Sequence, residues 1–110
     1  MAAANIALGV GWGTVATVSV LAGSTDQRGR CTVTASTSGV AQATATVTLT
    51  FADGAYGSAP FAEWRLVANT NGITEAQPMS QTQTTTAIAC THSVLPVDTK
   101  TYTFSWCVIA

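Results

Sequence analysis

The side chains that could perform acid–base or nucleophilic chemistry are few and widely spaced. His92 is the only histidine, so any triad built on serine or cysteine must use it. It follows an expected strand as a loop residue would, and no serine lies in the sharp turn typical of a nucleophile. We therefore predict that the protein is not an enzyme and has no catalytic residues.

The carboxylates are equally scattered along the chain. They are Asp26, Asp53, Glu63, Glu75 and Asp98. Calcium sites use a dense acidic loop, and none is present in the sequence. Asp53 and Asp98 precede Gly54 and Thr99, and this pattern is typical of turns in which aspartate bonds its own backbone. We predict structural turns at both positions, no metal ion and no cofactor.

The three cysteines form neither a disulfide framework nor a zinc motif. Cys31, Cys90 and Cys107 are an odd set without Cys-x-x-Cys spacing. Cys31 and Cys107 lie inside expected strands, where they are interpreted as small buried hydrophobic residues. The pattern favours maturation in a reducing cytoplasm, although a single disulfide is compatible with it.

Aromatic side chains are the remaining candidates for ligand contact, because their rings pack on the apolar faces of sugars. Trp12, Tyr56, Phe61 and Trp64 could line such a surface, but the strand position of Trp64 favours the core. Trp12 lies between two glycines, where a large ring gains little unless it inserts into a pocket of a neighbour. We expect Trp12 to be an assembly contact.

Charged residues make up 8% of the chain, against about 25% in ordinary globular domains. A surface so poor in charge is prone to association, which predicts that partner subunits cover much of it; a hydroxyl-rich monomer is the alternative. The four basic residues form no run, so nucleic-acid binding is not expected. Arg28 and Arg30 flank a glycine after Asp26, and they are either a solvated turn or an anchor for an anionic partner.

The first 13 residues are apolar but do not form an export signal. The first positive charge is Arg28, and glycines at 9, 11 and 13 interrupt any helix or membrane span. We predict an extended N-terminal arm over residues 1–13, followed by one domain over residues 14–110. The arm residues expected to reach a neighbouring subunit are Ile6, Leu8, Val10 and Trp12.

The chain that must position these residues is dominated by β-branched side chains with period-2 alternation. In residues 44–51 the hydrophobic side chains share one face and threonines the other. At 101–109, Tyr102, Phe104 and Trp106 alternate with hydroxyl side chains. Weaker strands are expected at 15–21, 30–35, 61–68, 78–83 and 85–91. In the strand at 61–68, the side chains of Trp64, Leu66 and Ala68 are expected to share a face.

The spacing of these strands predicts an all-β fold. At 110 residues the chain holds one core and one domain. Short strands separated by turn signals, with no helical window, predict a single-domain antiparallel β-sandwich or small barrel of about seven or eight strands.

The order of several short motifs resembles the small all-β modules on the outside of tailed-phage virions. Residues 22–34 are similar to the opening of these modules, with glycine, serine or threonine and aspartate before a Thr-Val-Thr strand. Residues 46–51 and 56–60 are similar to their central strand and Tyr-x-Ser-Ala-Pro turn. Residues 84–86 and 101–106 are similar to their late threonine run and closing strand.

The resemblance implies a structural virion protein made in the host cytoplasm without a signal peptide. A short stand-alone module of this kind implies a capsid decoration protein, usually a homotrimer, that binds the major capsid protein and stabilises the head. The alternative is a tail-fibre or receptor-binding tip, similar to the H-type lectins. In that case Tyr56, Trp64 and Asn69 are the candidate glycan contacts. Neither implies a nucleic-acid or membrane partner.

Overall fold

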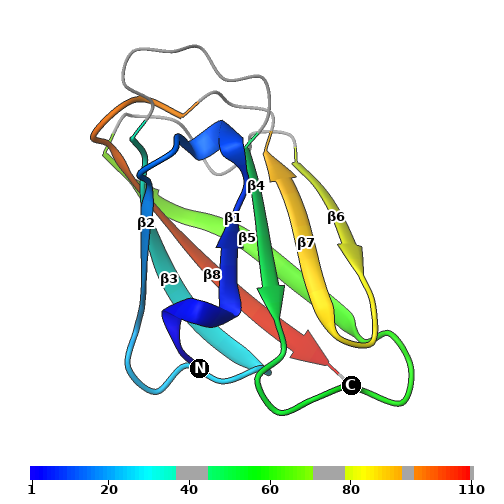
Figure 1. Ribbon diagram of the computed structural model, residues 1–110. Helices are drawn as coiled ribbons and strands as arrows, with labels where there is room; N and C mark the ends of the chain where they lie inside the picture. The colour runs from blue at the N-terminus through cyan, green and yellow to red at the C-terminus, as the bar shows by residue number, and fades with distance from the viewer. Residues whose placement is uncertain (37–44, 71–78, 93–95, 110) are drawn as a thin grey trace.

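A computed structural model describes residues 1–36, 45–70, 79–92 and 96–109 of the chain. Within these ranges, eight strands form two four-stranded antiparallel sheets that face each other as a sandwich (Figure 1). The strands are β1 Ile6–Leu8, β2 Thr17–Val20, β3 Arg28–Thr34, β4 Ala45–Thr50, β5 Phe61–Asn69, β6 Met79–Gln83, β7 Ala87–His92 and β8 Thr101–Ile109. The predicted all-β sandwich is confirmed, and the two separate sheets exclude the barrel alternative.

The first sheet has the strand order β1-β4-β7-β6 and the second the order β2-β3-β8-β5. β4 and β8 are central strands whose alternation matches the sandwich. Ala45, Val47 and Leu49 of β4 are buried, while the threonines between them are only half-buried. In β8, Phe104 and Trp106 likewise face inward. The hydrophobic period therefore fixes which face of each sheet forms the core.

Residues 1–13 are part of the sandwich, so the prediction of a separate extended arm is wrong. Ile6–Leu8 forms β1, which pairs antiparallel with β4 and places Ile6 opposite Leu49. A 3-10 helix at Val10–Trp12 follows. It inserts the Trp12 ring into the core, where the side chain is 2% exposed and the indole Nε1–H donates to the Thr46 carbonyl at 3.0 Å. Ile6 and Trp12 therefore fill the domain's own core, and Leu8 packs against it.

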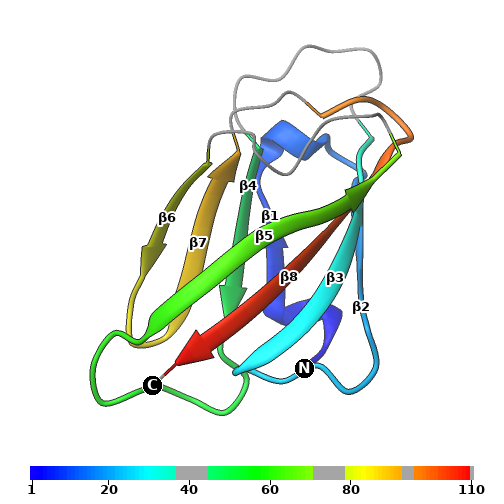
Figure 2. The ribbon, with the colours of Figure 1, turned by 180° about the vertical axis from the view of Figure 1, so that it is seen from behind.

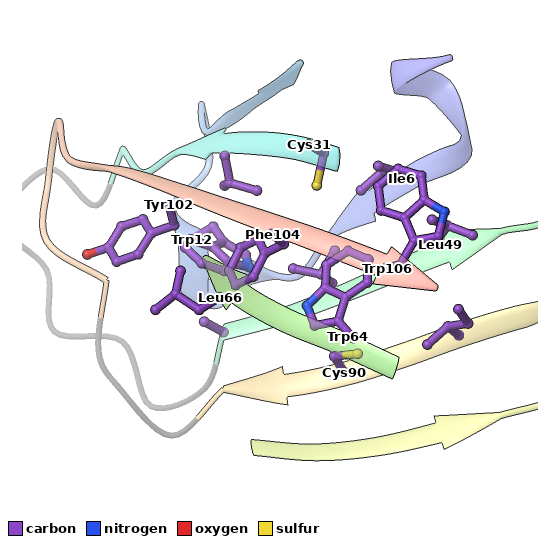
Figure 3. Packing of buried hydrophobic residues seen from close by; sticks show 14 of the residues in the cluster. Ile6, Trp12, Cys31, Leu49, Trp64, Leu66, Cys90, Tyr102, Phe104 and Trp106 are labelled. Carbon is purple, nitrogen blue, oxygen red and sulfur yellow. The ribbon is translucent and has the colours of Figure 1, made fainter. Parts of the chain in front are cut away.

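The core is organised around a series of aromatic rings (Figure 3). Trp12 makes edge contacts with Tyr102 and Phe104, with ring centroids 5.2 and 5.9 Å apart. Trp64 stacks on Phe104 at 5.4 Å and on Trp106 at 5.8 Å. Such pairs add to the free energy gained from burying the rings. The series joins β8 to β5 and to the N-terminal segment.

A buried carboxylate links the two sheets at the end of the sandwich that is lower in Figure 1. Asp26, in the loop between β2 and β3, accepts hydrogen bonds from the backbone amides of Ala52 at 2.6 Å and Asp53 at 2.8 Å. Those amides begin the loop after β4, which belongs to the other sheet. Asp26 therefore fixes the β2–β3 loop against the β4–β5 loop. The predicted turns at Asp53 and Asp98 are confirmed.

Candidate functional site

His92 is a packed aromatic side chain and lacks the surroundings of a catalytic base. It is the last residue of β7 rather than the predicted loop residue, because β7 extends to pair it with Ala45 of β4. Its ring stacks on Phe104 at 4.7 Å and meets Trp12 edge-on at 6.1 Å. Burial lowers the pKa of His92 to about 4, and its Nε2 is buried without a hydrogen-bond partner among the described residues. The imidazole is therefore neutral at physiological pH.

Two of the three cysteines are buried, as expected of small hydrophobic residues in strands. Burial raises the pKa of the Cys31 and Cys90 thiols to about 12, so both stay protonated. Cys107 was also predicted to be buried, and that prediction is wrong. It lies on β8 next to Trp106, whose side chain faces the core, so strand alternation places Cys107 on the outer face. All three cysteines are free.

The described residues were compared with the requirements of a metal site and of a membrane-spanning helix. No group of three or more histidine, cysteine, aspartate or glutamate side chains there could hold an ion. Likewise, none of the helices in these ranges has the length and apolar character needed to cross a bilayer.

The four predicted arm contacts do not form a common surface. Ile6 and Trp12 are buried in the core, and Leu8 packs against it. Val10 is 81% exposed. Trp12 is therefore not available as an assembly contact, because its ring fills the protein's own interior.

The three predicted glycan contacts are likewise dispersed. Trp64 is 2% exposed and belongs to the core. Asn69 ends β5, far along that strand from its first residue, Phe61. Tyr56 lies at the lower end of the sandwich, where its ring makes an edge contact with Phe51 at 4.9 Å. Of the three, only Tyr56 is placed where it could contact a ligand from that end.

The structure instead brings basic residues together on the outer face of the β2-β3-β8-β5 sheet, which faces the viewer in Figure 2. Arg30 of β3 and Arg65 of β5 both pair with Ser105 of the central strand β8, so the three form one row across the sheet. Two residues further along β8, Cys107 pairs with Arg28 on one side and Glu63 on the other. We call this surface the arginine face, and it comprises Arg28, Arg30, Glu63, Arg65, Ser105 and Cys107.

The arginine face holds three of the chain's four basic residues. All three arginines are exposed, and among the described residues their guanidinium groups make no hydrogen bond or ion pair. A shallow groove of about 480 Å³ runs along Arg28 and Arg30, between Ser105 and the segment from Leu21 to Ser24. Positive charge is thus concentrated on one side of a molecule with a net charge of −1.

An exposed apolar pair lies beside the arginines at the lower end of the same face. Phe61 of β5 and Ile109 of β8 pair in register and are 80% and 66% exposed. Together with the loop from Tyr56 to Pro60 they line a hollow of about 260 Å³. Tyr56 also lines a second hollow of about 390 Å³ beside Asp26 and Asp53. The face therefore combines cationic and apolar groups, as the centres of protein interfaces do.

Sequence reasoning identified Arg28 and Arg30 as interface candidates but did not include Arg65 or Ile109. Alternation could have placed Arg65 outward, since Trp64 and Leu66 on either side of it are buried. The arginines of β3 and β5 lie on one face because both strands flank β8. A period-2 pattern does not reveal this strand order.

Comparisons with protein-family models, with curated proteins and with solved structures find no match to this chain.

Proposed function

We propose that the protein is a non-catalytic structural module that decorates the outside of a phage head and stabilises it. The observation that carries this proposal is the arginine face, with three exposed arginines beside the exposed Phe61 and Ile109. Such a surface suits docking onto a partner, whereas His92, the only histidine, is neutral and half-buried against aromatic rings. The virion setting is supported by the motif order described above.

Decoration of this kind is a thermodynamic function. A protein that binds only the expanded shell stabilises that state by mass action, because it adds nothing to the unexpanded form. The partners are the major capsid protein and further copies of the same chain, most simply as a homotrimer. A charge content of 8% supports self-association, because it leaves few side chains to oppose contact between copies. Three linked copies would strengthen weak docking contacts through avidity.

The test combines light scattering with co-sedimentation. The purified protein is sized alone and then mixed with expanded, undecorated heads assembled from the major capsid protein encoded in the same genome. We expect a trimer that sediments with expanded heads and not with unexpanded ones, and that raises the temperature at which the expanded heads melt. A monomer that stays in the supernatant contradicts the proposal.

A second candidate is a glycan-binding tip, favoured by the position of Tyr56 between two hollows at the lower end of the sandwich. Its test is a glycan array with the wild-type protein and a Tyr56→Ala variant. Trp64→Phe is the matched control, because Trp64 is a core residue and its replacement should leave sugar binding unchanged. Binding of a defined sugar that is lost only in Tyr56→Ala would favour the tip over decoration.

A further inference from the structure

The arginine face has a charge that is opposite in sign to that of the whole chain. It carries three arginines and, among the described residues, a single carboxylate, which gives a local balance of +2 (3 − 1). The full sequence has a balance of −1. A surface of this sign attracts an anionic partner and repels an identical surface. Face-to-face pairing of two copies is therefore disfavoured, because it would bring arginines against arginines.

The spacing of two arginines suits a carboxylate. Arg30 and Arg65 are separated by one strand, so their Cα atoms are about 10 Å apart across Ser105. Each long side chain can lean toward the centre, and a guanidinium group presents a planar fork that matches a carboxylate. The Ser105 hydroxyl between them is a further donor. Arg28, two residues along β3, is placed to meet a second acidic group.

The apolar pair indicates that the anionic partner is a protein. Phe61 and Ile109 lie on the same face as the arginines, and covering them with apolar side chains removes hydrophobic surface from water. A nucleic-acid backbone offers no such cover. Arginines beside an exposed aromatic residue are typical of the residues that dominate protein–protein binding energy.

We infer that the arginine face is the docking surface for an acidic protein surface, whose carboxylates are held by Arg30 and Arg65 across Ser105 and by Arg28, next to the apolar contact of Phe61 and Ile109. This inference deepens the proposed function and rests on it for the partner's identity: on a phage head, the acidic surface belongs to the major capsid protein.

The experiment measures binding to a defined acidic polypeptide, fluorescein-labelled poly-L-glutamate, by anisotropy at about 0.1 M salt, where the Debye length is about 10 Å. A DNA duplex of similar length is the comparison probe. The variants are Arg30→Glu and Arg65→Glu. The matched control is Lys100→Glu, which makes the same charge change at the only basic residue outside the face. Circular dichroism and thermal melts check that each variant folds.

We expect Arg30→Glu and Arg65→Glu each to weaken poly-L-glutamate binding about tenfold or more, and Lys100→Glu to change it less than about twofold. Arg30→Lys should fall between wild type and Arg30→Glu, because it keeps the charge and loses the fork. Equal losses in all three glutamate variants would show that only net charge matters and would overturn the inference. Absence of wild-type binding, or tighter binding to DNA, would overturn it as well.

The same variants separate this inference from the proposed function when they are mixed with heads. If the variants lose poly-L-glutamate binding but the wild-type protein ignores expanded heads, the inference stands and the capsid role fails. If wild type and Arg65→Glu bind heads equally well, the decoration role stands and docking through the arginine face is refuted.

Discussion

Acidification should destabilise the fold through His92, the chain's single histidine, because the fold holds it half-buried against aromatic rings. The pKa of His92 falls from the ordinary value of 6.5 to about 4 in the folded protein. Between these values the unfolded chain binds a proton that the folded chain does not. Protonation of the unfolded chain therefore lowers the free energy of unfolding. This free energy has its full value above pH 6.5 and decreases as the pH falls toward 4.

The two pKa values set the size of the effect. Each unit by which the pKa differs between the folded and unfolded chains corresponds to about 1.4 kcal/mol in the free energy of unfolding. Relative to neutral pH, the free energy of unfolding should drop by about 1.4 kcal/mol at pH 5.5 and by about 3 kcal/mol at pH 4. The loss at pH 4 is a large part of the free energy of unfolding of a small domain, which is usually about 5–15 kcal/mol.

The assay is urea denaturation followed by tryptophan fluorescence at pH 7.5, 5.5 and 4. The control variant is His92→Phe, which keeps a ring on Phe104 and removes the titrating nitrogens. Carboxylates contribute equally to both proteins, so the difference between the two curves isolates His92. That difference should grow as the pH falls. A difference that stays constant from pH 7.5 to 4, or an NMR titration that gives His92 a pKa near 6.5, would refute the reasoning.

Three further perturbations test the packing described above. Trp12→Ala should lower the free energy of unfolding by about 3–5 kcal/mol, because it empties a core site. Deletion of residues 2–13 should abolish the folded state, because it removes β1 and Trp12. A deletion variant with native circular dichroism would instead support a separate N-terminal arm. Asp26→Asn should lower the free energy of unfolding by about 3 kcal/mol, because it weakens two charge-assisted hydrogen bonds. The exposed control Asp53→Asn should lower it by less than about 0.5 kcal/mol, and equal urea midpoints for the two variants would contradict this. A thiol reagent should label Cys107 in the native protein within minutes and the other two thiols only after unfolding; comparable rates for all three would contradict their burial.

Alternation along the chain was sufficient to predict the central strands of the fold. β4 and β8 each repeat hydrophobic and hydroxyl residues over several periods, and burial in the structure follows that repeat. β1 was missed because Ile6–Leu8 is too short to show a period. The role of Trp12 was missed for a different reason: its partner is the carbonyl of Thr46, and a contact across 34 positions leaves no local signal.

The ends of β5 show where local pattern and tertiary structure diverge. Trp64 and Leu66 face the core as predicted, whereas Ala68 is exposed because the register with β8 shifts between Leu66 and Ala68. An inserted residue of this kind reverses the alternation beyond it. The candidate site depends on such non-local features even more strongly, since Arg30 and Arg65 become neighbours of Ser105 only through the strand order β3-β8-β5.

The packed core beneath the arginine face favours binding, because it holds the sheet rigid. The three strands that form this face also turn the next row of side chains into the core, where Cys31 and Leu66 both pair with Phe104. The backbone under the site is therefore fixed before any partner arrives, and binding has to order only side chains, at about 2 kcal/mol of rotamer entropy for each arginine. Exposed guanidinium groups contribute little to folding, so charge reversal on this face should change binding and leave the melting temperature nearly unchanged. Core variants such as Trp12→Ala should do the reverse, weakening binding only in proportion to the fraction of protein that unfolds.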